Sequence, residues 1–113
     1  MFFGKEVRIL LKGQAKEAYI ELKKRGDKEA RILLNSIERI KNILKDNPHY
    51  GDPVRKELIP ESLKRLGINN LYRVELSNYW RMLYTLEGNK VEIFVLVLNI
   101  LDHNEYNKMF GYK

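Results

Sequence analysis

Residues whose types could support chemistry gather in the last third of this 113-residue chain. Arg73 and Glu75 alternate along one expected strand, Arg81 begins the next, and the run DHNEY at 102–106 follows the last. Metal-free RNA cleavage needs a base that removes the 2′-hydroxyl proton, cations that stabilise the transition state, and an acid that protonates the departing 5′-oxygen. His103 can titrate near neutral pH, and arginines hold phosphate oxygens in a fork geometry. The need for a 2′-hydroxyl would make RNA, and not DNA, the substrate.

The same residues also have structural interpretations. Asp102 and Glu105 have the spacing of a capping box, which would begin a short C-terminal helix without requiring His103. Arg73 and Glu75 suit an ordinary cross-strand ion network. The aromatic residues on the apolar side of these strands are more often core residues than base-stacking platforms. From the residues alone, the catalytic and the structural interpretation both stay open.

Other kinds of chemistry have little support. The absence of cysteine excludes thiol nucleophiles and cysteine-ligated zinc, and it suits a reducing compartment such as the cytoplasm. The seven glycines are scattered without a phosphate-binding pattern, and the two histidines lie far apart, so no cofactor and no metal is expected. The longest apolar run, 93–98, is too short to cross a bilayer, and no signal peptide is recognisable. We therefore expect a cytoplasmic protein with no membrane association.

The elements that must position the cluster begin with a strand and two helices. Alternating apolar residues predict a strand over residues 5–11. The period changes at Gly13 to that of a helix, which ends at Gly26. Asp27 can cap a second helix, whose apolar stripe continues to just before Asn47-Pro48. The short connection between the two helices predicts an antiparallel αα-hairpin.

A long connection and then β structure make up the second half. Residues 46–70 hold all three prolines and predict an irregular connection with one helical turn near 61–66. The runs 71–77, 80–86 and 91–98 predict an antiparallel meander, and the last run, apolar on both faces, predicts a central strand. We therefore expect one α+β domain: an N-terminal strand, an αα-hairpin, a three-stranded antiparallel meander that completes a four-stranded sheet, and a short C-terminal tail or helix. The hairpin would cover one sheet face and leave the other at least partly open.

The formal net charge of +6 is concentrated before residue 46, because residues 12–45 carry ten basic and five acidic side chains. Such a field attracts phosphate backbones, acidic membrane surfaces or acidic proteins. A lysine-rich solvated helix face explains the same charge equally well. The basic residues expected on the outer side of the second helix are Arg31, Arg39, Lys41 and Lys45.

The order of the elements, and above all the motifs LYRVEL, WRMLY and HNEY, resembles the RelE/ParE toxin superfamily. In that superfamily a hairpin with an arginine, two hydrophobic residues and a tyrosine precedes an apolar strand and a short tail that bears histidine or arginine and a tyrosine. The match covers the whole chain in pattern and its last third in recognisable residues. The resemblance implies a small toxin paired with an antitoxin, and its RelE branch implies a ribosome-dependent mRNA endonuclease that uses no metal.

Carried over by position, the resemblance implies a role for each residue of the cluster. Arg81 matches the arginine that acts on the scissile phosphate, and Arg73 matches a basic residue one strand earlier. Tyr106 matches the tail tyrosine, and His103 falls near the position of an arginine or histidine, which implies a general acid or base. Glu75 departs from the pattern, since some RelE proteins have a basic residue there, and it would itself serve as a base.

The resemblance also implies partners. One is mRNA on the ribosome, which Arg73 and the basic residues of the second helix would bind. The other is a cognate antitoxin, whose amphipathic helix and extended segment would cover the basic surface, so the protein would be a monomeric toxin or part of a toxin–antitoxin hetero-oligomer. Two alternatives stay open: a ParE-like inhibitor that binds DNA gyrase without catalysis, and a non-catalytic relative that binds RNA or a protein partner.

Overall fold

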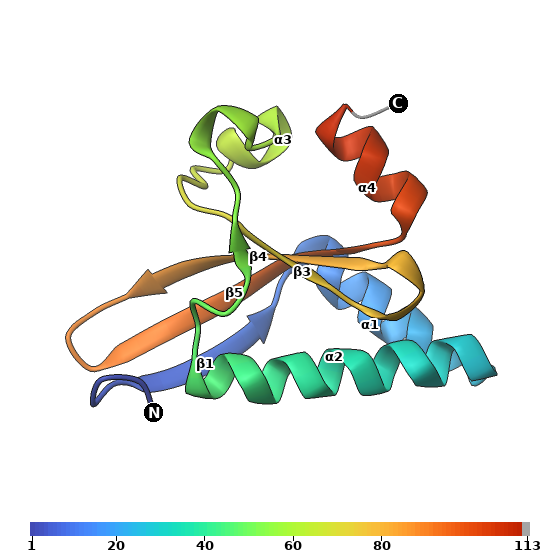
Figure 1. Ribbon diagram of the computed structural model, residues 1–113, viewed down its shortest axis with the longest axis horizontal. Coiled ribbons are helices and arrows are strands. Elements are labelled where there is room, and N and C mark those ends of the chain that lie inside the picture. Colours follow the sequence, from blue (N-terminus) through green and yellow to red (C-terminus); the bar gives the residue numbers. More distant parts are fainter. Residues whose placement is uncertain (112–113) are drawn as a thin grey trace.

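The computed structural model describes residues 1–111, which form a five-stranded sheet with helices on both faces (Figure 1). The strands are β1 (Glu6–Leu11), β2 (Asp52–Pro53), β3 (Tyr72–Glu75), β4 (Arg81–Gly88) and β5 (Glu92–Leu101). The α-helices are α1 (Gly13–Arg25), α2 (Lys28–Asp46), α3 (Glu61–Lys64) and α4 (His103–Phe110), and short 3-10 turns cover Lys56–Leu58 and Ser77–Tyr79. The predicted α+β class is confirmed. None of the helices within residues 1–111 is long and apolar enough to span a bilayer.

The sheet has the strand order β1-β5-β4-β3-β2. β1 runs parallel to β5, and every other pair of neighbours is antiparallel. The predicted meander is therefore present as β3, β4 and β5, and β5 lies inside the sheet, as its two apolar faces indicate. The predicted number of four strands is wrong, because Asp52 and Pro53 pair with Arg73 and Tyr72 and add β2 at one edge. Proline fits at this position, since a strand at the edge can leave one N–H out of the ladder.

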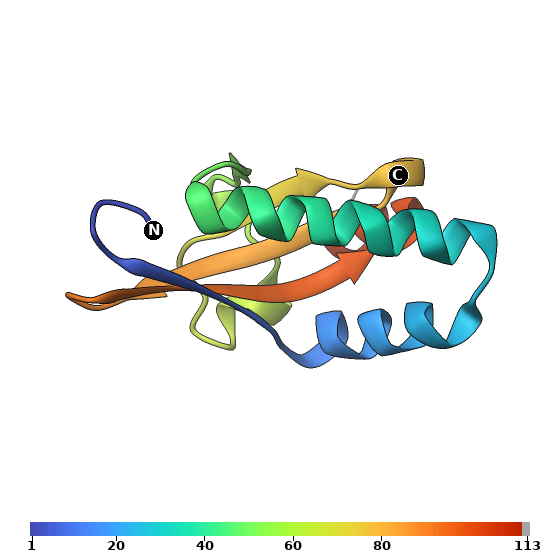
Figure 2. The same ribbon diagram turned by 90° about the horizontal axis from the view of Figure 1, so that it is seen from below.

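The helices α1 and α2 pack on the lower face of the sheet, the face toward the bottom of Figure 1 (Figures 1 and 2). α1 ends at Gly26, whose φ of +66° is a left-handed cap that glycine adopts without strain. Asp27 then caps α2 by accepting a hydrogen bond from the backbone N–H of Ala30. The buried residues of this lower core are Ala15, Leu22, Ala30, Leu33, Ile37, Ile40, Leu44, Val74, Leu76, Met82, Tyr84, Val95, Val97 and Ile100.

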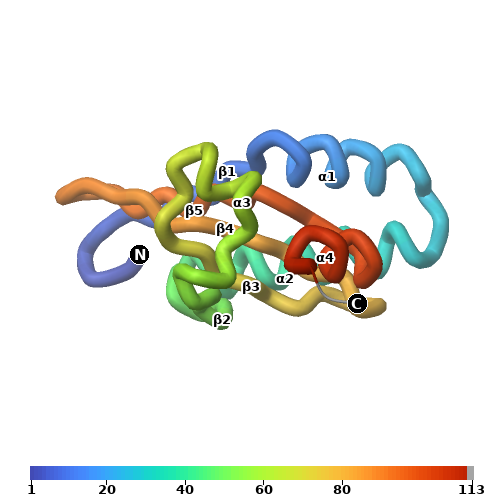
Figure 3. The backbone as a smooth tube through the Cα atoms, turned by 90° about the horizontal axis from the view of Figure 1, so that it is seen from above, coloured from blue at the N-terminus to red at the C-terminus, as the bar shows by residue number. Residues whose placement is uncertain are grey.

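The opposite, upper face is covered in part by the segment 54–68 and by α4 (Figures 1 and 3). The one helical turn predicted near 61–66 is present as α3. Alternation along β4 turns Leu83 upward and Met82 downward, so one strand contributes to both layers. The buried residues of the upper core are Ile59, Leu63, Leu71, Leu83, Leu101 and Tyr106. The upper face is therefore partly open, as the sequence predicts, and Leu10 on β1 is 43% exposed.

A buried tyrosine fixes the start of the connection between α2 and β3. The Tyr84 hydroxyl donates a hydrogen bond to the Pro48 carbonyl at 2.8 Å and accepts one from the Gly51 N–H at 2.9 Å. Gly51 leaves room for this contact, since a Cβ there would lie 2.9 Å from the same hydroxyl. The chain is thus held against β3, and Asp52 pairs with Arg73.

Candidate functional site

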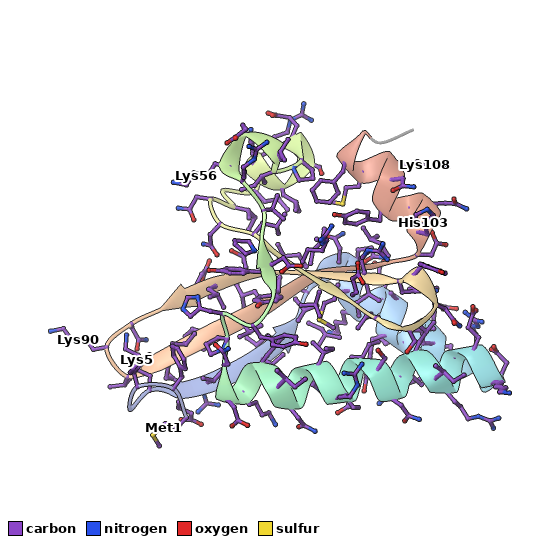
Figure 4. The ribbon with its side chains drawn as sticks, in the orientation of Figure 1. Met1, Lys5, Lys56, Lys90, His103 and Lys108 are labelled. Carbon is purple, nitrogen blue, oxygen red and sulfur yellow. The ribbon has the colours of Figure 1, made fainter. Side chains whose placement is uncertain are left out.

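The residues singled out on the last strands and the C-terminal segment meet on the upper face. Antiparallel pairing places Glu75 opposite Arg81, and Arg73 lies two residues before Glu75 on the same side of β3. α4 follows β5 and returns over this face, which brings Tyr106 to both arginines. His103 lies at the start of α4, near the β3–β4 turn (Figure 4). We call these five residues the upper cluster.

Arg73 reaches from β3 to a neighbour on either side. Its Nη1 donates to the Tyr106 hydroxyl and its Nη2 donates to Asp52 Oδ2, each at 3.4 Å. The hydrogen bond to Tyr106, aided by the one to Asp52, raises the pKa of the Arg73 guanidinium above its ordinary value. The side chain of Arg73 is 34% exposed and that of Asp52 is 76% exposed. This ion pair is therefore open to water and to competing anions.

Arg81 is more enclosed than Arg73, with a side chain that is 13% exposed. Its Nη1 donates to the Tyr79 carbonyl at 2.6 Å, and its Nη2 lies 3.9 Å from Glu75 Oε1. The guanidinium stands 5.4 Å from the centroid of the Tyr106 ring, which is a cation–π distance. Its Nε is buried and has no hydrogen-bond partner within residues 1–111. The guanidinium of Arg81 is thus held in place, and its Nε–H is left without a hydrogen-bond acceptor among the described residues.

Tyr106 lies between the two arginines and is 4% exposed. Its hydroxyl accepts from Arg73, the face of its ring meets Arg81, and its ring centroid lies 4.6 Å from that of Phe110. Tyr106 also belongs to the upper core. The tail tyrosine expected from the sequence is therefore a positioning group for both cations as well as a packing residue.

The first turn of α4 combines a helix cap with the expected acid or base. Asp102 Oδ1 accepts from the Glu105 N–H at 2.8 Å, and Glu105 Oε1 accepts from the Asp102 N–H at 3.0 Å, which is the capping box that the spacing predicts. His103 takes no part in this box, and it is exposed. Its Nε2 lies 3.2 Å from the side-chain nitrogen of Asn107, and its ring centroid lies 6.2 Å from that of Tyr79. Capping explains the two carboxylates and leaves the imidazole at the surface.

Glu75 is the exposed carboxylate of the upper cluster, with a side chain that is 68% exposed. A carboxylate with this freedom can turn from Arg81 toward a bound hydroxyl group, as a general base must. With Asp52 it also balances the formal charges of Arg73 and Arg81. The cluster therefore has local cationic groups without a large excess of positive charge.

The basic residues that the sequence assigns to RNA binding on α2 lie in the other helical layer. Arg31, Arg39 and Lys45 are exposed and lie off the buried stripe of α2. Lys41 is half-buried, with its Nζ 5.9 Å from the centroid of the Tyr19 ring. α2 and α4 are on opposite faces of the sheet (Figure 1). The structure brings Arg73 into the upper cluster and keeps these four residues on a separate surface.

The sequence pattern does not identify two residues that contact the upper cluster. Asp52 falls in the expected irregular connection, and its pairing with Arg73 follows directly after the hydrogen bonds of the Tyr84 hydroxyl to Pro48 and Gly51, which we call the Tyr84 anchor. No local pattern reveals these contacts. Tyr79 falls in the expected hairpin turn, yet the residue is 74% exposed and its ring lies beside that of His103. A signal for Tyr79 does exist, because two-residue hairpin turns favour asparagine and glycine and rarely contain an aromatic residue.

Two hollows flank Arg73. One of about 310 Å³ is lined by Tyr50, Gly51, Asp52, Arg73, Val74 and Glu75. The other, of about 170 Å³, lies between the β2 segment and α4 and is lined by residues that include Arg55, Leu58 and Tyr106. In the described part of the chain, no three histidine, aspartate or glutamate residues gather as metal ligands would.

The upper cluster can therefore hold an anion at its arginines and present an imidazole and a carboxylate near that anion. These are groups that bind a phosphate and transfer protons. Comparison of the chain with protein-family models, with curated proteins and with solved structures gives no match.

Proposed function

We propose that this chain is a RelE-like toxin of the RelE/ParE superfamily, which cleaves mRNA on the ribosome by acid–base attack of the 2′-hydroxyl and without a metal. The observation that carries the proposal is the contact of Arg73 and Arg81 with one buried residue, Tyr106, beside the exposed His103. The order of strand, αα-hairpin, meander and C-terminal helix, on which the family resemblance depends, supports the same proposal.

The scissile phosphate binds at the two arginines. Arg73 would exchange its exposed partner Asp52 for a phosphate oxygen, at little cost because exposed ion pairs contribute little stability. Arg81 is already oriented by the Tyr79 carbonyl and the Tyr106 ring. A donor fixed before the substrate arrives needs no reorganisation when charge develops on the phosphate.

Proton transfer falls to the two titratable groups at the margin of the cluster. Glu75 takes the proton from the 2′-hydroxyl, whose oxygen attacks phosphorus, and the bond from phosphorus to the 5′-oxygen breaks. His103 gives a proton to the departing 5′-oxygen, so the products are a 2′,3′-cyclic phosphate and a 5′-hydroxyl. Tyr106 keeps both arginines in place during this step.

A separate basic surface is available for the ribosome. Arg31, Arg39 and Lys45 are exposed on α2 and would meet ribosomal RNA through its phosphates, with Lys41 at their border. In the cytoplasm of the producing cell an antitoxin would cover this surface or the upper cluster by charge complementarity.

Ribosome-dependent cleavage in a reconstituted translation reaction tests the proposal, with the 5′ ends of the mRNA mapped. His103→Ala should lower the rate by about 10²- to 10⁴-fold, which is the usual contribution of a general acid or base. Asn104→Ala, one residue later on the same exposed turn, is the matched control and should cut like the wild type. Cleavage should also persist in a chelator that leaves the ribosome intact. Absence of ribosome-dependent cuts by the wild type would falsify the proposal.

A second candidate is a non-catalytic inhibitor, either ParE-like and directed at DNA gyrase or directed at another partner. The observation that favours it is the carboxylate partner of each arginine, which leaves the cluster without an excess of positive charge. This candidate predicts inhibition of supercoiling, no RNA cleavage, and full tolerance of His103→Ala.

A further inference from the structure

The turn between β3 and β4 holds an aromatic residue in a conformation that aromatic residues rarely adopt. Asn78 and Tyr79 have φ values of +56° and +62°, and the Trp80 N–H closes the turn on the Ser77 carbonyl at 3.2 Å. Asparagine tolerates this region, and glycine is the usual second residue because it has no Cβ to clash. Tyr79 is therefore held against its local preference.

Packing does not account for the presence of Tyr79. The residue is 74% exposed, whereas the next residue, Trp80, packs against the lower core. A ring in this position buries little apolar area and so contributes little to folding. Residues held in sparsely populated backbone conformations cluster at binding and catalytic sites. The exposed ring therefore needs an explanation other than stability.

Two members of the upper cluster hold Tyr79 in place. Arg81 Nη1 donates to its carbonyl at 2.6 Å, so the proposed phosphate-binding residue also fixes the backbone of the turn. The His103 ring meets the Tyr79 ring edge-on, with centroids 6.2 Å apart and planes at 62°. Most of the surface of Tyr79 is left to solvent beside Arg81 and His103.

We infer that Tyr79 is a stacking platform for an unpaired RNA base that neighbours the phosphate at Arg81, an inference that rests on the proposed function. Every nucleobase has a π-face that stacks on tyrosine, so such a platform tolerates different sequences. It requires a base that is not already stacked in a duplex. Tyr79 would therefore select single-stranded RNA and fix which phosphate reaches the arginines.

The surroundings of Tyr79 favour a nucleic-acid base over an apolar protein segment. Its neighbours are a guanidinium, an imidazole, and the polar residues Ser77 and Asn78. Within the described residues, no other large apolar side chain of this turn or of α4 is exposed. Protein hot spots are normally ringed by further contacts that exclude water, and Tyr79 has no such ring.

The test is the binding of short, fluorescein-labelled single-stranded RNAs with 2′-O-methyl groups, which cannot be cleaved through the 2′-hydroxyl. Fluorescence anisotropy at low salt gives the Kd. Tyr79→Gly removes the ring at a position whose backbone suits glycine, so it should weaken binding by about 5- to 150-fold, the range for loss of one base stack, while the fold is retained. Tyr79→Phe keeps the ring and should bind within about twofold of the wild type.

An abasic site moved along the RNA identifies the stacked nucleotide. At one position it should weaken binding to the wild type and leave binding to Tyr79→Gly unchanged, because the two changes remove the same contact. Thermal unfolding of Tyr79→Gly at or above the wild-type temperature excludes loss of fold, and Tyr79→Asn, which also tolerates positive φ, provides a second variant without the ring.

Equal Kd values for Tyr79→Gly and the wild type overturn the inference, as does failure of the wild type to bind any of the RNAs. Loss of binding to a protein partner with unchanged RNA affinity overturns it too. The outcome is separable from that of the proposed function. If RNA binding needs Tyr79 but the protein shows no ribosome-dependent cleavage, the stacking platform stands and the nuclease proposal fails. If the protein cleaves mRNA on the ribosome but Tyr79→Gly binds RNA as tightly as the wild type, the nuclease proposal stands and the platform fails.

Discussion

The two faces of the sheet differ in how they are covered, although the same strands form both. The lower face lies under two helices of 13 and 19 residues, and its core is almost entirely aliphatic. The upper face lies under a helix of four residues and one of eight. Its core is bordered by Arg73 and Arg81, which contact the core residue Tyr106. Arg73, Asp52 and Glu75 lie where the cover is incomplete and keep contact with water, whereas Arg81 is held beneath Tyr106.

Tyr106 belongs both to the upper core and to the upper cluster. It is buried among the apolar residues of the upper core, and the same side chain contacts both arginines. A disturbance of the upper core should therefore reach the upper cluster, whereas an equal disturbance of the lower core should act on global stability alone. This difference can be tested by substitutions on each face.

The largest expected effect comes from opening a cavity in each core. Ile37→Ala in the lower core should lower the free energy of unfolding by about 2–5 kcal/mol, because the long helices cannot close over the space. Leu101→Ala in the upper core should cost about 2 kcal/mol, since short covering segments collapse more readily. Urea denaturation measures both. Equal losses would show that the two covers are equally rigid, and a smaller loss for Ile37→Ala would show that the upper cover is the more rigid.

The next effect concerns the Tyr84 anchor. Burial raises the pKa of the Tyr84 phenol from about 10 to about 12. The folded state favours the neutral phenol, so this stabilisation is fully present below pH 10 and is lost as the pH rises toward 12. Tyr84→Phe should cost about 1–3 kcal/mol near neutral pH, because the Pro48 carbonyl and Gly51 N–H lose their partner.

Urea denaturation of the wild type and Tyr84→Phe across this alkaline range provides the measurement. The difference between the two proteins should shrink as the pH passes from about 10 to 12. A constant difference would mean that burial does not raise the pKa of the Tyr84 hydroxyl in the folded state.

The structure on the lower face is predictable from the sequence because its helix caps and apolar periodicity agree with its tertiary contacts. The stripe from Ala30 to Leu44 has helical period, Asp27 is a good cap, and Gly26 ends the preceding helix, so the αα-hairpin follows from short segments. The alternation in β3 and β4 likewise places Arg73 and Arg81 on one face, and the capping box starts α4. These parts of the site were available from the sequence.

The remaining features depend on contacts between distant segments. The pairing of Asp52 with Arg73 lies next to two hydrogen bonds of the Tyr84 hydroxyl, which donates to the Pro48 carbonyl and accepts from the Gly51 N–H and so joins residues more than thirty positions apart. The burial of Tyr106 and the cover over Leu83 likewise arise when segment 54–68 and α4 meet. No periodicity encodes these long-range contacts, so the sequence does not predict the extra strand β2 or which segments cover part of the upper face.

A smaller effect is expected at the cap of α4. Asp102→Ala removes half of the capping box and should cost about 1 kcal/mol of stability. Fraying of the first turn should also increase hydrogen exchange at the amide of Tyr106, whereas Asn104→Ala should leave exchange there unchanged. Unchanged exchange in Asp102→Ala would show that the upper core, and not the cap, holds α4 over the arginines.

The smallest effect on stability, and the sharpest on function, comes from the carboxylates beside the arginines. Asp52→Asn and Glu75→Gln should each change stability by no more than about 0.5 kcal/mol, because the side chains of Asp52 and Glu75 are themselves exposed. Each substitution frees an arginine, so both should strengthen the binding of uncleavable RNA, measured by anisotropy. Both effects should fade as salt is added.

Cleavage should separate the two variants. Asp52→Asn keeps the proposed base and should cut at least as fast as the wild type, whereas Glu75→Gln should cut about 10²-fold or more slowly while binding more tightly. RNA affinity then rises while the cleavage rate falls only for the carboxylate that accepts the proton from the 2′-hydroxyl. If Glu75→Gln cuts as fast as Asp52→Asn, Glu75 is only the ion partner of Arg81. The base must then be another group within reach of the phosphate, and His103 is the other proposed proton-transfer residue of the upper cluster.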